Sequence, residues 1–136
     1  MPKSTEIDAR LPSQTPTAVY ESTGINMLEL LGDIFVRDTI PTIPEIKALR
    51  AVVYEHIRVS QNDLEFLGEH IMGEVDCLGV VHDFFGVDVS VTDFYLSPVP
   101  WVATLITSGE SREQVWLKRQ RIIDNIKSYL KRPARV

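Results

Sequence analysis

The sequence lacks most of the features that would name a chemistry. Its 136 residues contain one cysteine, Cys77, which excludes an internal disulfide and any zinc site built from paired cysteines. It has no glycine-rich phosphate-binding loop, no Walker sequence and no G-x-S-x-G sequence. No uncharged apolar run approaches the ~20 residues that span a bilayer, and no basic-then-apolar leader opens the chain. We therefore expect a cytoplasmic protein.

Charge is distributed unevenly along the chain. Residues 110–136 hold eight Lys/Arg and three Asp/Glu, whereas residues 1–109 hold six and sixteen. The net charges of the two parts are therefore +5 and −10. An acidic body with a basic end indicates that the end contacts an anionic surface. That surface could be the body of the same chain, another copy or a foreign partner.

Length and apolar content predict one globular domain. An apolar share of 44% in 136 residues is typical of a soluble protein with a core of its own. Residues 1–19 contain three prolines and no periodic apolar pattern, which predicts a disordered or loosely attached tail. We expect residues 20–136 to form a single helical domain. The predicted fold class is mainly α, a bundle of about four helices with an irregular or short β segment near 87–107.

Four segments have apolar residues at helical spacing. The second has the clearest start, because Thr42 supplies a capping hydroxyl and a proline and a glutamate follow it. In the third, Leu78 lies at the centre of the apolar stripe and is expected in the core. Ser111 caps the last helix. The predicted helices cover residues 24–37, 42–59, 62–85 and 110–131.

Two further segments are rich in β-branched residues. Residues 87–92 alternate between apolar and polar side chains, which predicts a short strand. Residues 101–107 fit either a strand paired with 87–95 or a short helix. We expect the helix, because Pro98 before the segment and Gly109 after it form a matched pair of helix signals.

The last predicted helix carries Arg112 and Arg119 in the middle of its apolar arc. A buried guanidinium needs a carboxylate, because an unpaired charge in apolar surroundings costs several kcal/mol. Arg119 pairs either with an acid of the body or across an interface, and we expect the internal pair. The same arc is the candidate partner-binding surface. Its members are Arg112, Trp116, Arg119, Ile123, Ile126 and Leu130.

Histidines next to acidic residues occur in the predicted helices. A di-iron site on helices needs a glutamate and a histidine at i, i+3 twice, and no such pair occurs. His70 and Glu74 are four apart, which is one pair and not a site. Cys77 would lie ~10 Å from His70 along a helix axis, too far for activation by that base. We predict no catalytic residue, no metal and no cofactor, and we expect Cys77 to be structural. The sequence leaves open whether His56, His70 or His82 is functional.

These patterns predict a non-catalytic protein-binding module, such as a regulator, inhibitor, chaperone or immunity-type neutralising protein. We do not expect an enzyme. The protein itself could be the partner, because the apolar arc of the last helix exceeds what a small bundle buries, and we expect a homodimer. The alternative is a transcriptional regulator that binds DNA through the basic C-terminal segment. A second alternative is a helical metal protein or enzyme. No membrane contact is expected.

Overall fold

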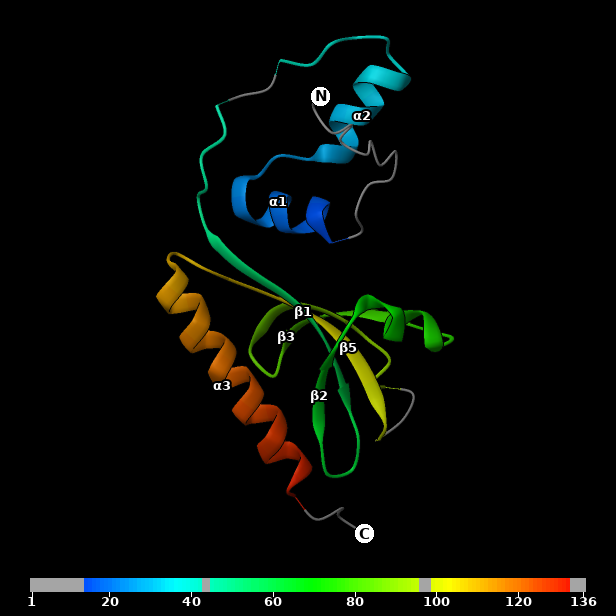
Figure 1. Cartoon of the computed structure of the whole chain (residues 1–136), viewed down its shortest axis with the longest axis vertical. Coiled ribbons are helices and arrows are strands. Elements are labelled where there is room, and N and C mark those ends of the chain that lie inside the picture. Colours follow the sequence, from blue (N-terminus) through cyan, green and yellow to red (C-terminus); the bar gives the residue numbers. More distant parts are fainter. Residues whose placement is uncertain (1–13, 43–44, 96–98, 133–136) are drawn as a thin grey trace, which may run out of the picture.

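The computed structural model describes residues 14–42, 45–95 and 99–132. Two short helices come first, then five strands interrupted by one 3-10 helix, and a long helix ends the described chain (Figure 1). The helices are α1 (Thr15–Thr23), α2 (Met27–Phe35), η1 (Glu69–Glu74) and α3 (Arg112–Leu130). The strands are β1 (Ala51–Val59), β2 (Leu64–Leu67), β3 (Gly79–Phe84), β4 (Val87–Thr92) and β5 (Trp101–Gly109).

The strands form one antiparallel sheet in the order β2-β1-β5-β4-β3. At its centre β1 pairs with β5 along its whole length, from Ala51 opposite Gly109 to Val59 opposite Trp101. In Figure 1, α3 runs along one side of the sheet, and α1 and α2 lie at the end where β1 begins. Helices α1 and α3 therefore contact the sheet, and α2 packs against α1.

The core lies between α3 and one face of the sheet. Ile57 and Val59 from β1 and Leu105 from β5 have at most 1% of their surface exposed. Burying such side chains contributes about 1.5–3 kcal/mol each and is the main stabilising term. The buried cluster consists of Ile57, Val59, Phe84, Val87, Trp101, Ala103, Leu105, Ile122, Ile123 and Ile126.

Local signals explain both ends of the fold. Gly24 ends α1 in the left-handed conformation, with φ of 76°, which glycine adopts without a steric cost. Asn26 then caps α2, because its side-chain oxygen accepts from the backbone N–H groups of Leu28 and Glu29. Ser111 caps α3 in the same way through the N–H of Gln114.

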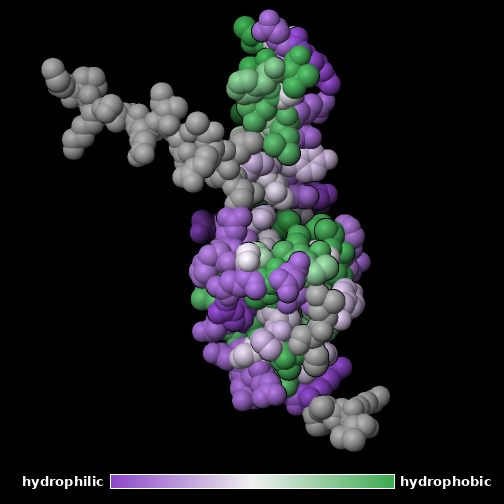
Figure 2. Space-filling model, turned by 90° about the vertical axis from the view of Figure 1, so that its right-hand side faces the viewer, coloured by the Kyte–Doolittle hydropathy of each residue, from purple (hydrophilic) through white to green (hydrophobic). Residues whose placement is uncertain are grey.

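The second helix, α2, buries none of its residues in this chain. Leu28 is 63% exposed and Phe35 is 81% exposed. Figure 2 shows this apolar surface gathered over the upper part of the molecule, where α1 and α2 lie. An apolar helix face without a cover is typical of a surface that contacts another polypeptide segment.

The predicted helical bundle is wrong, since the structure is built on a five-stranded antiparallel sheet. The segment predicted as the second helix contains β1. Its stripe of Leu49, Val53 and Ile57 has residues four apart, and such residues share a face of a strand as well as of a helix. The spacing of this stripe therefore did not distinguish a helix from a strand.

The third predicted helix is also wrong and is replaced by β2, η1 and β3. Gly68 and Gly79 stand at the breaks between these elements. Leu78, expected in the core, is 37% exposed. The short helix expected at 101–107 is strand β5, which is buried on both faces and therefore lacks an alternating pattern. The strand predicted at 87–92 is confirmed as β4, and the helix predicted at 110–131 is confirmed as α3.

The tail predicted for residues 1–19 overlaps α1, which begins at Thr15. Residues 1–13 lie outside the described residues, as does Pro98. Among the described helices, none has the length and apolarity needed to cross a membrane.

Candidate functional site

A groove of about 670 Å³ lies between α1, the start of β1 and the first turn of α3. We call it the α1–α3 groove. Its walls are mostly apolar and include Val19, Val52 and Val115. Two arginines, Arg50 and Arg112, line it together with the indole of Trp116. Ligand-binding pockets typically have volumes of ~300–1,000 Å³, mainly apolar walls and a few polar groups, which describes this groove.

Backbone hydrogen bonds hold Arg50 at the groove. The carbonyl of Ser22 near the end of α1 accepts from the N–H of Leu49 at 2.8 Å and from that of Arg50 at 3.1 Å. These two bonds join the chain just before β1 to α1. The backbone of Arg50 is therefore fixed even though its side chain is exposed.

The cap of α3 holds Arg112 at the opposite wall. Ser111 is extended and accepts from Gln114, so Arg112 is the first helical residue. Gly109 lets the end of β5 lie close to the first turn of α3, because a Cβ at position 109 would lie 3.1 Å from the backbone nitrogen of Val115. The unpaired N–H groups at the start of a helix add partial positive charge to the same region.

The groove carries positive charge in a chain with a net charge of −5. No carboxylate lines it among the described residues. Neither Arg50 nor Arg112 forms an ion pair with an acid in the described part of the chain. Glu110 and Glu113 flank Arg112 in sequence but do not line the groove.

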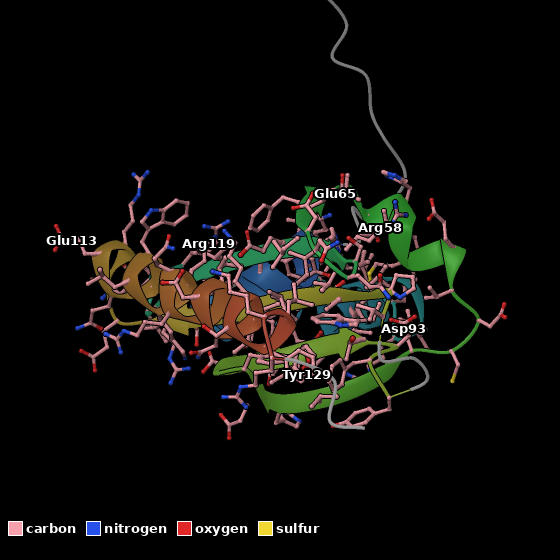
Figure 3. All side chains as sticks on the ribbon, turned by 90° about the horizontal axis from the view of Figure 1, so that it is seen from below. Arg58, Glu65, Asp93, Glu113, Arg119 and Tyr129 are labelled. Carbon is pink, nitrogen blue, oxygen red and sulfur yellow. The ribbon has the colours of Figure 1, made fainter. Side chains whose placement is uncertain are left out.

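Beside the groove, Arg119 pairs with Glu55 of β1. Its Nε donates to the two carboxylate oxygens at 2.8 and 2.9 Å, and both side chains are less than one fifth exposed. The guanidinium lies 4.7 Å from the ring centre of Phe66 and 4.9 Å from that of Trp116. Figure 3 shows Arg119 on the part of α3 next to the sheet. The predicted internal pair is therefore confirmed, and Glu55 is its acid.

A second polar group lies on the other face of the sheet. His56 is 4% exposed, and its Nδ1 lies 2.8 Å from the hydroxyl of Thr104. Its Nε2 lies 2.7 Å from the side-chain nitrogen of Gln14, which can only donate. Nε2 is therefore the acceptor, and Nδ1 carries the proton that is donated to Thr104. Burial lowers the pKa of His56, and the negative charge of Glu69 opposes this effect.

This environment predicts loss of stability in weak acid. The pKa of His56 is below its ordinary value of 6.5 in the folded state, so the unfolded chain binds the proton more strongly. Stability is fully present above pH 6.5 and is lost as the pH falls toward the folded-state pKa. We expect the melting temperature to fall from pH 7.5 to 5.5, and to fall less in His56→Gln. His82→Gln, at an exposed position, should keep the wild-type profile. Identical profiles for His56→Gln and the wild type would contradict this assignment.

The other histidines and the cysteine are not assembled into a site. His70, His82 and Cys77 are exposed. The described residues contain no group of three or more His, Cys, Asp or Glu side chains placed to hold a metal ion. Glu74, considered with His70 as a ligand pair, instead pairs with Arg58.

The predicted partner-binding surface is divided by the structure. Ile123 and Ile126 are buried in the core, and Leu130 packs against it. Arg119 is paired inside the chain, while Arg112 and Trp116 line the α1–α3 groove. Sequence reasoning did not identify Arg50. Arg50 lay inside the helix predicted at 42–59, so it could be found only after the start of β1 had been placed correctly.

Three ligases from Methanosarcina species are similar to this chain. Each is a 3-methyl-D-ornithine--L-lysine ligase. The Methanosarcina mazei protein is 35% identical over 129 residues, which cover 93% of this chain and 33% of that protein. The Methanosarcina acetivorans protein is 35% identical over 121 residues, covering 87% of this chain and 31% of that protein. The Methanosarcina barkeri protein is 35% identical over 115 residues, covering 84% and 30%.

The chain thus spans about a third of the length of the curated relatives it matches. No protein-family model matches it. The predicted non-catalytic binding module, including the expectation of no enzyme, is contradicted because these relatives carry the name of an enzyme. The expectation of an all-α regulator is wrong for the same reason and because the structure contains a five-stranded sheet.

Proposed function

We propose that this chain forms one part of a ligase that joins two amino acids. The supporting observation is 35% identity over 93% of the chain to a relative named for joining 3-methyl-D-ornithine and L-lysine. That alignment leaves out less than a tenth of the chain, so it includes most of the sheet and of α3. The reaction class, the joining of two amino acids, is proposed. The identity of the two amino acids that this protein joins is likewise part of the proposal.

The exposed apolar face of α2 supports a role as part of a larger enzyme. The relatives are about three times as long as this chain, and α2 buries none of its residues here. Covering side chains such as Leu28 and Phe35 would stabilise the assembly by about 25 cal/mol for each Å² of apolar surface removed from water. In the proposed enzyme, the polypeptide that corresponds to the other two thirds covers this face.

A chimeric enzyme tests the proposal. The matched third of the Methanosarcina mazei ligase is replaced by this chain, and the joined product of 3-methyl-D-ornithine and L-lysine is measured by mass spectrometry. We expect product formation, and none from the same ligase with its matched third deleted. A chimera that melts cooperatively and forms no product from any pair of amino acids would contradict the proposal.

The face of α2 gives a separate prediction. The double substitution Leu28→Asp and Phe35→Asp should leave the melting temperature of the 136-residue chain within a few degrees, because both side chains are exposed. In the chimera, it should lower product formation at least tenfold by disturbing a contact that the isolated chain does not make. Leu117→Asp is the matched control, since Leu117 is 61% exposed but lies on α3. Equal effects of the two changes would count against the α2 contact.

A homodimer is the alternative cover for α2. Light scattering of the 136-residue chain at tens of micromolar distinguishes a second copy from the rest of the proposed enzyme. A dimer mass that falls to the monomer mass in Leu28→Asp would assign the α2 face to a second copy. A cytoplasmic location also belongs to the proposal, since the exposed thiol of Cys77 fits a reducing compartment.

A further inference from the structure

The α1–α3 groove combines two guanidinium groups with an apolar channel. Arg50 and Arg112 approach it from different elements, one from the chain before β1 and one from α3. Each is anchored through its backbone, by the carbonyl of Ser22 and by the cap at Ser111 respectively. Neither arginine forms an ion pair with an acid in the described part of the chain. Intramolecular ion pairs there therefore do not account for two arginines on one groove.

The other walls restrict what these cations would bind. Val19, Val52 and Val115 offer aliphatic surface, and Trp116 offers a ring that is 59% exposed. Arginine binds carboxylates and phosphates through paired N–H···O bonds, while a free cation would be repelled by two positive charges. The groove therefore fits a molecule with an oxyanion and an apolar or planar body.

We propose that the α1–α3 groove is an oxyanion-binding site, with Arg50 and Arg112 as the groups that bind the anion. The oxyanion chemistry follows from the groove itself. The choice of ligand rests on the proposed function, because amino acids supply carboxylates and the nucleoside triphosphate consumed by a ligase supplies phosphates. The apolar walls contact the body of the ligand. Arg119 already contacts the ring of Trp116, and the 59% of Trp116 that stays exposed can contact a planar ligand.

Two matched pairs of probes test the site on the 136-residue chain. L-lysine and L-lysine amide differ in the carboxylate, and adenosine triphosphate and adenosine differ in the phosphates. Binding is followed by NMR through the backbone amides of residues 18–23, 50–53 and 112–116 and the indole N–H of Trp116. We expect the anionic member of at least one pair to shift these signals and its partner to shift them at least tenfold more weakly.

Each result has one meaning for the proposal. A preference for L-lysine over its amide supports a carboxylate ligand, and a preference for adenosine triphosphate over adenosine supports a phosphate ligand. If neither anionic probe binds, or if the shifts lie outside the groove, the proposed site is wrong. Because binding is measured without turnover, that result would leave the activity of the chimera as an independent test of the ligase function.

Substitutions identify the groups responsible. Arg112→Gln and Arg50→Gln should each weaken binding about tenfold or more, because each removes a charged hydrogen-bonding partner of the anion. Both side chains are exposed, so the melting temperature should stay unchanged. Arg121→Gln, on the exposed side of α3 and outside the groove, is the matched control. Equal affinity for the control and the two groove variants would overturn the assignment.

Discussion

Trp101→Ala should lower the free energy of unfolding by ~3–5 kcal/mol, the usual cost of truncating a buried aromatic side chain. Trp101 is 1% exposed and belongs to the core between α3 and the sheet. Its ring centre lies 5.3 Å from that of Phe94, 5.5 Å from that of Phe84, and 6.2 Å from the stacked ring of Phe85. Truncation therefore leaves a cavity and removes several aromatic contacts at once.

Urea denaturation measures this loss in the free energy of unfolding, and two further variants serve as controls. Trp116→Ala should cost less than ~1 kcal/mol, because that ring is 59% exposed. Trp101→Phe should cost much less than the alanine variant. It keeps an aromatic ring and removes a buried indole N–H that has no hydrogen-bond partner among the described residues. Similar losses for Trp101→Ala and Trp116→Ala would contradict the placement of β5 in the core.

Arg119→Leu should lower the free energy of unfolding by ~2–4 kcal/mol, because it leaves the carboxylate of Glu55 largely buried without its partner. The value is below that of a fully buried pair, since about a sixth of each side chain is exposed. The variant also removes the contacts of the guanidinium with Phe66 and Trp116.

A double-mutant cycle separates the ion pair from these ring contacts. Adding Glu55→Leu to Arg119→Leu should recover part of the loss, because an apolar pair replaces an unpaired charge. Light scattering of the same variants should give unchanged masses, since Arg119 pairs inside the chain. A double variant less stable than Arg119→Leu would show that the ring contacts, and not the pair, account for the effect.

The ends of the fold were predictable because their signals are local. The cap at Ser111 and the apolar stripe that includes Ile122 and Ile126 identify α3 within two residues at each end. The region of α2 was also found, because Met27–Phe35 lies within the helix predicted at 24–37. The internal pairing of Arg119 followed from its place on the apolar arc of α3.

The central sheet was not predictable by the same reasoning. In β1, Val53 and Ile57 satisfy the helical and the strand period together, and only the β-branched content of residues 51–59 favours a strand. Strand β5 is buried on both faces, so it has no alternation to detect. The partner of Arg119, Glu55, and the groove residue Arg50 could not be placed until β1 was recognised as a strand.

The pairing of β1 with β5 also determines when the protein can fold during synthesis. Ala51 pairs with Gly109, and the intervening chain must be complete before the two central strands can meet. Closing so long a segment costs conformational entropy that is recovered only after β5 is available, which slows folding. On the ribosome, β1 and β2 can form only a hairpin, which is marginally stable in water, while their apolar faces stay exposed. The sheet therefore assembles late, once residues 101–109 have emerged, and α3 follows directly to cover it.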